Sequence, residues 1–338
     1  MLVSVILCTH SLANCQNLAE AVDSLLQQVY QEIEIVIVVD GNDELHQRVV
    51  TDYGSQETVK TILLKQNVGL CGARNAGIGA AQGDIIAFLD DDAVAERRWV
   101  ENLVATYQES QAIAVGGKIL PHWLGQRPDY LPEELYWLVG TTHEGFADEK
   151  VVEVRNPFGP NMSFRKEVFQ KVGLFNEDFG FARRGASYMQ AEEAEFTLRM
   201  KERLGQGVIY NPRALVYHKI PPSKVKVKAL LRRAFYQGYS KALLRKLNPS
   251  ADSIATERAY LQTLLLKYIP QRMKRVYCLP ELKRLFILVA SIISVGLGFV
   301  YGCVKGVPPA SNQNSSGMSR ISSRHRRGGA ARFTWTGR

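Results

Sequence analysis

Short apolar runs alternate with amphipathic stretches within residues 1–120. The apolar runs are rich in β-branched residues, as buried strands are, and they cover residues 3–7, 33–40, 58–64 and 84–90. The stretches between them carry apolar residues at helical spacing, most clearly residues 17–29 and 70–82. This alternation predicts an α/β fold, in which a Rossmann-like, mostly parallel sheet is flanked by helices on both faces.

Polar side chains stand where these predicted strands end. Thr9 follows the first strand, Asp40 ends the second, and Asp90, Asp91 and Asp92 follow the apolar residues IIAFL. Parallel sheets bind ligands at the carboxyl ends of their strands, so these side chains are candidates for a binding site. Adjacent carboxylates raise one another's pKa, and a Mn²⁺ or Mg²⁺ ion, which prefers oxygen ligands, would compensate for this. The alternative is a solvated acidic turn that caps the next helix.

The composition is that of a globular protein. At 338 residues, of which 46% are hydrophobic, the chain is long enough for one large or two modest domains. Its five cysteines are odd in number, scattered and without CxxC spacing. This argues against a disulfide framework or a zinc site and favours a reducing compartment. The first ten residues lack a basic segment, so we interpret them as a strand rather than a signal peptide.

Charge divides the chain into an acidic part and two basic parts. Residues 1–218 hold 19 Lys and Arg against 30 Asp and Glu, residues 219–284 hold 16 against 3, and residues 305–338 hold 7 against 0. Basic segments fit either nucleic acid or an anionic membrane surface. Residues 285–304 favour the membrane, because twenty residues without a charge are enough to cross the ~30 Å hydrocarbon core of a bilayer.

The C-terminal part is therefore predicted to contain a single-pass transmembrane helix at residues 285–304, with a buried core helix as the alternative. Residues 219–284 are predicted to form basic, interfacial helices at the membrane lipids, because residues 224–246 mix cations with Leu, Phe and Tyr at roughly helical spacing. A solvated basic helix is the alternative there. Residues 305–338, rich in Ser, Gly and Arg, are expected to be disordered. No nucleic-acid partner is expected, since the sequence carries no RNA- or DNA-binding motif.

Several motifs follow one another in a fixed order within residues 1–218. They are the opening strand with Thr9, VVDG at residues 38–41, NVGLCGARNAGI at 67–78, FLDDDA at 88–93, NPFGPNMSFRK at 156–166 and AEEAEFTLR at 191–199. Together they resemble the family 2 glycosyltransferases of the GT-A fold, and the resemblance covers roughly residues 2–218. It implies that these residues form a GT-A catalytic domain.

In the donor half, the resemblance implies binding of a nucleotide sugar, with a UDP-sugar expected. The implied donor-binding residues are Thr9, Asp40, Asn67, Gly69, Arg74, Asp90 and Asp91. Arg74 would lie near the donor phosphates, with a surface ion pair as the alternative. The implied metal ligands are Asp92, Asp90 and His218, because many relatives have a histidine after this strand that reaches the metal or the diphosphate. A histidine at a strand end is otherwise more often a packed or surface residue.

In the acceptor half, the resemblance implies a catalytic base at the start of a helix. An inverting transfer needs a base to take the proton of the acceptor hydroxyl while a metal stabilises the leaving diphosphate. By correspondence this base is Glu193, and Glu192 is the alternative, because the family usually has the shorter Asp at this position. Asn161 and Trp137 are expected to bind the acceptor. Aromatic rings such as that of Trp137 can stack on sugars, although ordinary packing explains them equally well.

The sequence thus predicts a membrane-anchored, metal-dependent, inverting glycosyltransferase that uses a nucleotide sugar and a glycan or polyprenyl-linked acceptor. Its catalytic domain would face the cytoplasm, where nucleotide sugars are generally made, and the basic block before the span agrees with this orientation. The tail after the span is also basic, which leaves its side of the membrane open. The alternative function is a catalytically idle GT-A-like scaffold that binds nucleotide sugars at the membrane.

Overall fold

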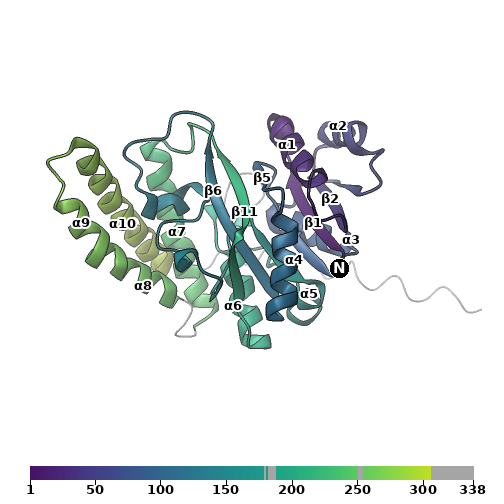
Figure 1. Ribbon diagram of the computed structural model, residues 1–338. Coiled ribbons are helices and arrows are strands. Elements are labelled where there is room, and N and C mark those ends of the chain that lie inside the picture. The colour runs from purple at the N-terminus through teal and green to yellow at the C-terminus, as the bar shows by residue number, and fades with distance from the viewer. Residues whose placement is uncertain (179, 182–187, 250–253, 306–338) are drawn as a thin grey trace, which may run out of the picture. The chain divides into compact units, whose positions relative to one another are not determined.

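The computed structural model describes residues 1–178, 180–181, 188–249 and 254–305. Its first part is the predicted alternation of strands and helices (Figure 1). The elements are β1 (Val3–Thr9), the 3₁₀ turn η1 (Leu12–Asn14), α1 (Cys15–Leu26), β2 (Ile33–Asp40), α2 (Asp43–Tyr53), β3 (Val59–Leu64), α3 (Leu70–Ala80) and β4 (Ile85–Phe88). The four strands are parallel and stand in the order β3-β2-β1-β4, which confirms the expected parallel sheet for this part.

Beyond β4 the sheet becomes mixed. β8 (Met162–Arg165) lies antiparallel between β4 and β6 (Ala114–Trp123), and β6 pairs in parallel with the long strand β11 (Val208–Ile220). Two short strands, β5 (Ala93–Ala95) and β7 (Val152–Val154), add antiparallel to β11. The predicted parallel arrangement therefore stops where β8 inserts, in a described sheet of nine strands.

Helices cover both faces of this sheet because its strands are apolar on both sides. Along β2, Ile35 and Ile37 face one core while Val36 and Val38 face the other. The first core is closed by α1, α2 and α4 (Trp99–Ser110), and the second by α3, α5 (Lys166–Val172) and α6 (Glu192–Leu204). A strand buried on both faces reads as a continuous apolar run, which is why the sequence indicated these strands clearly.

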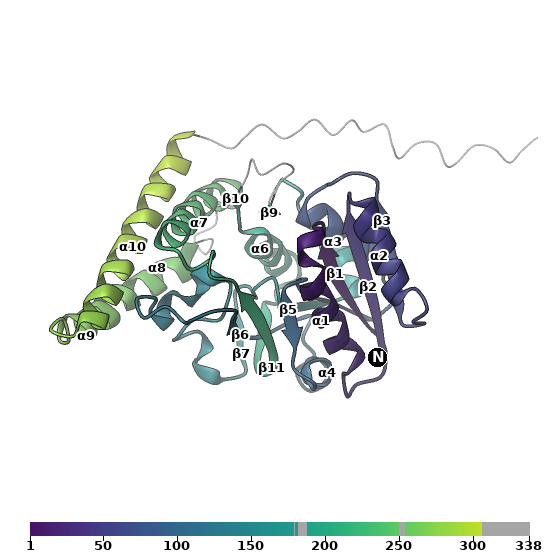
Figure 2. The ribbon, with the colours of Figure 1, turned by 90° about the horizontal axis from the view of Figure 1, so that it is seen from above.

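The C-terminal helices pack on the side of the sheet where β6 and β11 lie, away from β3 and α2 (Figures 1 and 2). They are α7 (Val227–Leu247), α8 (Ala255–Thr263), the π-helical turn η6 (Leu264–Tyr268), α9 (Ile269–Met273) and α10 (Leu279–Lys305). The remaining elements are η2 (Glu133–Val139), η3 (Ala147–Glu149), β9 (Gly180–Phe181) and β10 (Tyr188–Met189). Residues 1–307 form one compact unit, so α7 to α10 belong to the same unit as the sheet.

Helix α10 contains the predicted span and begins six residues earlier than the uncharged stretch. By length and composition it could cross a membrane. One side of it packs against α7 at unusually short range: a Cβ added to Gly298 would lie 1.8 Å from the carbonyl oxygen of Phe235, and one added to Gly238 would lie 1.9 Å from that of Val295. The two helices can approach this closely only because glycine stands at the crossing. Apart from Lys305, the basic tail expected at residues 305–338 lies outside the described residues.

Candidate active site

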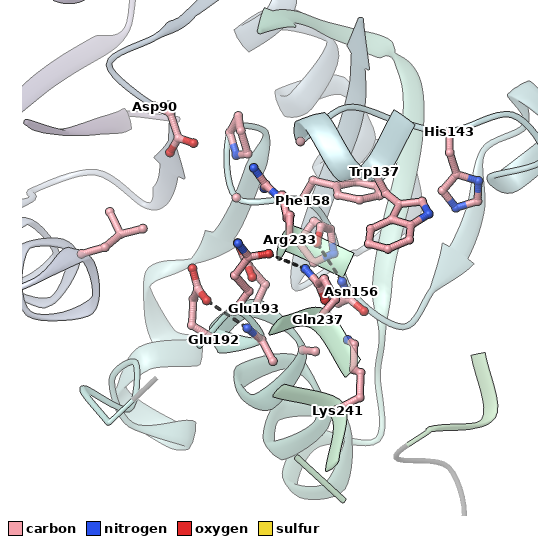
Figure 3. Close-up of a pocket in the computed structure, with 18 of the residues that line it drawn as sticks. Asp90, Trp137, His143, Asn156, Phe158, Glu192, Glu193, Arg233, Gln237 and Lys241 are labelled. Atoms are coloured by element: carbon pink, nitrogen blue, oxygen red, sulfur yellow. Dashed lines mark hydrogen bonds between the residues drawn. The ribbon is translucent and has the colours of Figure 1, made fainter. Parts of the chain in front are cut away.

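A cavity of about 1240 Å³ opens at the carboxyl ends of β1, β2 and β4 and extends to α7, α8 and α10 (Figure 3). Its lining residues run from Cys8 to Phe299, which are 291 positions apart in the chain. All the predicted site residues except Asn161 line it, namely Thr9, Asp40, Asn67, Gly69, Arg74, Asp90, Asp91, Asp92, Trp137, Glu192, Glu193 and His218. The end of a parallel sheet is the expected place for a ligand, and here α7, α8 and α10 also contribute to the cavity wall.

At the end of the cavity next to β2, Asp40 fixes the turn that leads into α3. One carboxylate oxygen accepts the backbone N–H of Val68 at 2.7 Å and the other accepts that of Gly69 at 2.9 Å. Gly69 has a φ of 87°, a conformation that residues with a side chain rarely adopt. The side-chain amide of Asn67 reaches the Asp40 carbonyl at 3.5 Å. Asp40 therefore holds Asn67 and Gly69 at the cavity wall in addition to lining the cavity itself.

Arg74 is the buried centre of a group of carboxylates. Its side chain is 2% exposed and lies 3.5 Å from Asp90, 3.5 Å from Glu192 and 4.0 Å from Glu193. Burial opposes its charge, but these carboxylates outweigh burial and raise the pKa of the guanidinium. The guanidinium of Arg74 is itself buried, so its contacts differ from the surface ion pair that was the alternative.

The three consecutive aspartates point to three different partners. Asp90 faces Arg74, and Asp91 accepts a hydrogen bond from the amide of Asn14 at 3.3 Å. Burial is the main cause that raises the pKa of both carboxyls, that of Asp91 to about 6. The three side chains are partly exposed and all line the cavity, which favours a binding site over a fully solvated acidic turn.

Asp92 lies in a compact group with His218 and Lys224. His218 Nε2 is 3.1 Å from one Asp92 oxygen, while Lys224 Nζ is 2.8 Å from the other and 3.4 Å from His218 Nε2. Burial works against ionisation of Asp92, but the hydrogen bonds and charges of its two partners prevail and lower its pKa. No three His, Cys, Asp or Glu side chains of the described residues are already gathered round one point. Asp92 and His218 would nevertheless offer a carboxylate oxygen and an imidazole nitrogen to a Mn²⁺ or Mg²⁺ ion that displaced Lys224 from Asp92.

The two glutamates at the start of α6 differ in environment. Glu192 is 5% exposed, and one of its oxygens accepts the backbone N–H of Ala191 at 3.1 Å while the other faces Arg74. Glu193 is 19% exposed and lies further from Arg74. Burial and then the charge of Glu192 raise the pKa of Glu193 to about 7. Ala191, which precedes them, has a φ of 155°, a strained value for a residue with a side chain. The backbone thus holds these carboxyls in place at some cost.

The structure contradicts the prediction that Asn161 binds the acceptor. Its side chain is completely buried and lies outside the cavity. The amide oxygen accepts the indole N–H of Trp99 at 2.9 Å, and the amide nitrogen donates to the carbonyls of Lys118 at 2.9 Å and Ala214 at 2.8 Å. Both donors are used, so Asn161 ties β8 to β6, β11 and α4 instead of meeting a ligand.

Trp137 fits either interpretation of the aromatic segment. It lines the cavity, and its indole N–H donates to the hydroxyl of Tyr260 on α8 at 3.0 Å. Trp123 and Tyr136, by contrast, pack edge to face against each other, with ring centroids 5.7 Å apart. Within this segment, Trp137 therefore lines the cavity, whereas Trp123 and Tyr136 pack against each other.

Sequence reasoning missed a set of polar residues contributed by α7. Arg233, Gln237 and Lys241 line the cavity together with Arg155. Their spacing of four residues, which places side chains on one helical face, was a usable signal. This stretch was interpreted from the sequence as an interfacial helix that faces lipid, so the spacing was overlooked. In the structure α7 packs between the sheet and α10 (Figure 2).

The family model described as "Glycosyl transferase family 2" matches residues 4–173. The chain belongs to glycosyltransferase family 2. It is 40% identical, over 89% of its length and 96% of the relative's, to a glucosyl-dolichyl phosphate glucuronosyltransferase of Haloferax volcanii. This family 2 member is therefore a glycosyltransferase, as predicted.

Solved structures agree with this family 2 fold. A Pyrobaculum calidifontis mannosyltransferase in complex with GDP-Man and Mn²⁺ has a TM-score of 0.59 and 16% identity, and the match covers 88% of this chain and 87% of that one. S. aureus TarS in complex with UDP-GlcNAc has a TM-score of 0.52 and 17% identity, covering 87% and 82%. The GT-A fold expected from the sequence motifs is confirmed.

Proposed function

We propose that this protein is an inverting, metal-dependent glycosyltransferase that transfers a sugar from a nucleotide sugar to a polyprenyl-phosphate-linked sugar at a membrane. The observation that carries the proposal is that one cavity is lined both by the charged groups near β1, β2 and β4 and by the apolar side chains of α8 and α10. A donor with a diphosphate suits the charged part of this lining, and an acceptor with a hydrocarbon chain suits the apolar part. The name of the Haloferax relative, which refers to glucosyl-dolichyl phosphate, supports the same acceptor class.

Glu193 is proposed as the base. Its pKa of about 7 suits a group that takes a proton near neutral pH, whereas Glu192 is held by Arg74 and by the Ala191 N–H. The acceptor hydroxyl would lose its proton to Glu193 as its oxygen attacks the anomeric carbon. The bond to the diphosphate breaks on the opposite face, which inverts the configuration at that carbon.

The opposite wall of the cavity is proposed as the donor site. Thr9, Asp40, Asn67 and Gly69 would meet the nucleoside, while Arg74, Asp90 and Asp91 lie where the sugar and its phosphates would pass. Asp92 and His218, with Asp90, would hold the Mn²⁺ or Mg²⁺ ion, which neutralises the charge of the leaving diphosphate when bound. A UDP-sugar is the proposed donor.

Helix α10 is proposed to anchor the protein, with the catalytic part on the cytoplasmic side. Its exposed face carries large apolar side chains, among them Phe286, Ile293, Leu297 and Val300. The basic residues before the span agree with this orientation, since anionic lipids attract each nearby Lys or Arg by about 1 kcal/mol.

The test is transfer by the purified full chain in lipid vesicles. A panel of nucleotide sugars would be offered with polyprenyl-phosphate-linked glucose or with a soluble polysaccharide, and the product identified by mass spectrometry. We expect a lipid-linked disaccharide with inverted configuration at the transferred sugar. Transfer to polysaccharide alone would refute the acceptor class. Tight nucleotide-sugar binding with neither transfer nor hydrolysis would favour the idle scaffold instead.

A further inference from the structure

The cavity has a basic region that the transfer chemistry described above does not use. The carboxylates Asp90, Glu192 and Glu193 lie at its donor end, whereas Arg233, Gln237 and Lys241 line it along α7. Residues four apart lie on the same helical face, so these three side chains form a strip that Figure 3 shows running away from Glu193. Eight residues of helix separate Arg233 from Lys241, which places them about 12 Å apart along the axis.

Arg233 is a cation without a fixed partner. No described carboxylate lies within ion-pair distance of it, and its buried Nε has no hydrogen-bond partner. An unsatisfied buried donor normally destabilises the folded state, and more so when the group is charged. Such a group in a cavity wall is explained if a ligand supplies the missing acceptor.

The far end of the strip already binds an oxyanion from the protein itself. Glu257 on α8 accepts two hydrogen bonds from Arg155, at 2.6 and 2.7 Å, and lies 2.9 Å from Lys241 Nζ. Two cations share this one carboxylate, so a net positive charge remains. Together with Arg233, these cations outnumber the carboxylate of Glu257 in this part of the cavity wall.

Beyond the cations the cavity wall becomes apolar. Its lining there comes from Leu261 and Leu264 on the α8 side, and from Ile292, Val295 and Phe299 of α10. A molecule that fills the whole space would therefore present a hydroxyl to Glu193, an anion to α7 and a hydrocarbon chain to α10. That order of groups is the order found in a sugar linked through phosphate to a polyprenol.

We propose that Arg233, Gln237 and Lys241 form the binding site for the phosphate of this acceptor, with the hydrocarbon chain lying against α8 and α10. This inference rests on the proposed function and assigns residues to its acceptor. The sugar of the acceptor lies between the phosphate and Glu193. A bare polyprenyl phosphate bound at the same place would leave the sugar position empty, and its phosphate would lie too far from the base to react. The site thereby selects an acceptor that already carries one sugar.

The test compares two acceptors that differ only in the phosphate: polyprenyl-phosphate-linked glucose and the neutral prenyl glucoside of the same chain length. Arg233→Gln should raise the KM for the phosphate acceptor about 10- to 100-fold, as expected for the loss of a charged hydrogen bond. The kcat, and the KM for the neutral acceptor, should stay within about twofold. Arg232→Gln is the matched control, because Arg232 carries the same charge on the same helix but is exposed and does not line the cavity.

A second variant tests the oxyanion site in the opposite direction. Glu257→Gln removes the carboxylate that competes for Arg155 and Lys241, so the KM for the phosphate acceptor should fall while that for the neutral acceptor does not. Thermal unfolding of each variant in vesicles would show that α8 remains in place. An unchanged or raised KM for the phosphate acceptor in a folded Glu257→Gln protein would contradict the proposed site.

The possible outcomes separate this inference from the proposed function. If the unaltered protein transfers to no lipid-linked phosphate, the proposed function fails and this inference fails with it. If it does transfer, but Arg233→Gln keeps the preference for the phosphate acceptor, only this inference is wrong. Inhibition by vesicles of anionic phospholipid that is lost in Arg233→Gln would show that the strip binds a membrane headgroup instead, which also overturns it.

Discussion

Glu193 and Glu192 are adjacent in the chain and differ in the charges that surround them. Because burial and Glu192 raise the pKa of Glu193 to about 7, its basic form is the major form only above that pH. The kcat should therefore rise about tenfold per pH unit below pH 7 and level off above it. Glu193→Gln should lower kcat by about 10²- to 10⁴-fold and remove this pH dependence. Initial rates from pH 5 to 9 with saturating donor would measure both.

The control for this prediction is Glu192→Gln, which should lower kcat less and retain the acidic limb. Nucleotide-sugar binding by calorimetry should persist in both variants, since neither residue is proposed to hold the nucleotide. If Glu192→Gln lowered kcat more than Glu193→Gln, Glu192 would be the base.

The group of Asp92, His218 and Lys224 predicts a dependence on divalent metal. EDTA should abolish transfer and added Mn²⁺ should restore it, because otherwise no ion neutralises the leaving diphosphate. Asp92→Ala should remove calorimetric Mn²⁺ binding while leaving the thermal unfolding curve cooperative. Full activity in chelator would mean that Lys224, which already pairs with Asp92 at 2.8 Å, suffices as the cation.

Asn161 matters for stability and not for binding. Asn161→Ala would leave the Trp99 indole and two buried carbonyls without partners, so the free energy of unfolding should fall by on the order of 3 kcal/mol. Denaturant unfolding would measure this loss, and donor KM should not change. Asn156→Ala, from the same loop but at the cavity wall, should be close to neutral in stability.

At the scale of elements, the sequence predicted the strands and helices whose residue pattern lies within one short stretch of the chain. The strand ending at Asp40 was predicted with its observed bounds, because β2 is apolar on both faces and polar residues flank it. The place of β8 could not be predicted, since Met162–Arg165 is a short strand that inserts between β4 and β6 from a distant part of the chain. Strand order is a non-local property, and periodicity carries no information about it.

The crossing of α7 and α10 offers a test at the same scale. Gly298→Ala would place a methyl group against the backbone of Phe235, so the helices would have to separate. We expect a lower thermal midpoint and a larger loss of transfer than of donor hydrolysis, because the apolar wall of the cavity would shift. Gly296→Ala, on the same helix, meets no atom within 4 Å and should be tolerated. Equal behaviour of the two variants would argue against a tight crossing.

At the scale of the whole molecule, the motifs located the cavity but not its full extent. The side with Thr9, Asp40 and Asp90 was predicted to line a binding site because these residues stand at strand ends, and all three do line the cavity. The cavity lining from α7 was not predicted, since the sequence of a basic helix with apolar residues is the same whether the helix faces lipid or a cavity. Only the packing of α7 beneath α10 distinguishes the two.

Membrane attachment is also a property of the whole molecule. The full chain should sediment with membranes and resist carbonate extraction. Replacing Ile293 and Leu297, which are 55% and 60% exposed on α10, by lysine should release the protein, because charges inside a bilayer are costly. The matched control replaces Leu26 and Val50, which are exposed apolar positions on α1 and α2, by lysine. This variant should stay with the membranes. Recovery of the unaltered chain in the soluble fraction would return α10 to the alternative of a core helix.

Because α10 forms one wall of the cavity, an acceptor held in the bilayer would reach the site by lateral diffusion and would never cross water. Its effective concentration is then a mole fraction in the lipid. Diluting vesicles in buffer should leave the rate per enzyme unchanged, while diluting the acceptor with inert phospholipid at constant bulk concentration should slow it. The rate would depend on the mole fraction of the acceptor in the membrane and not on its concentration in the cell volume.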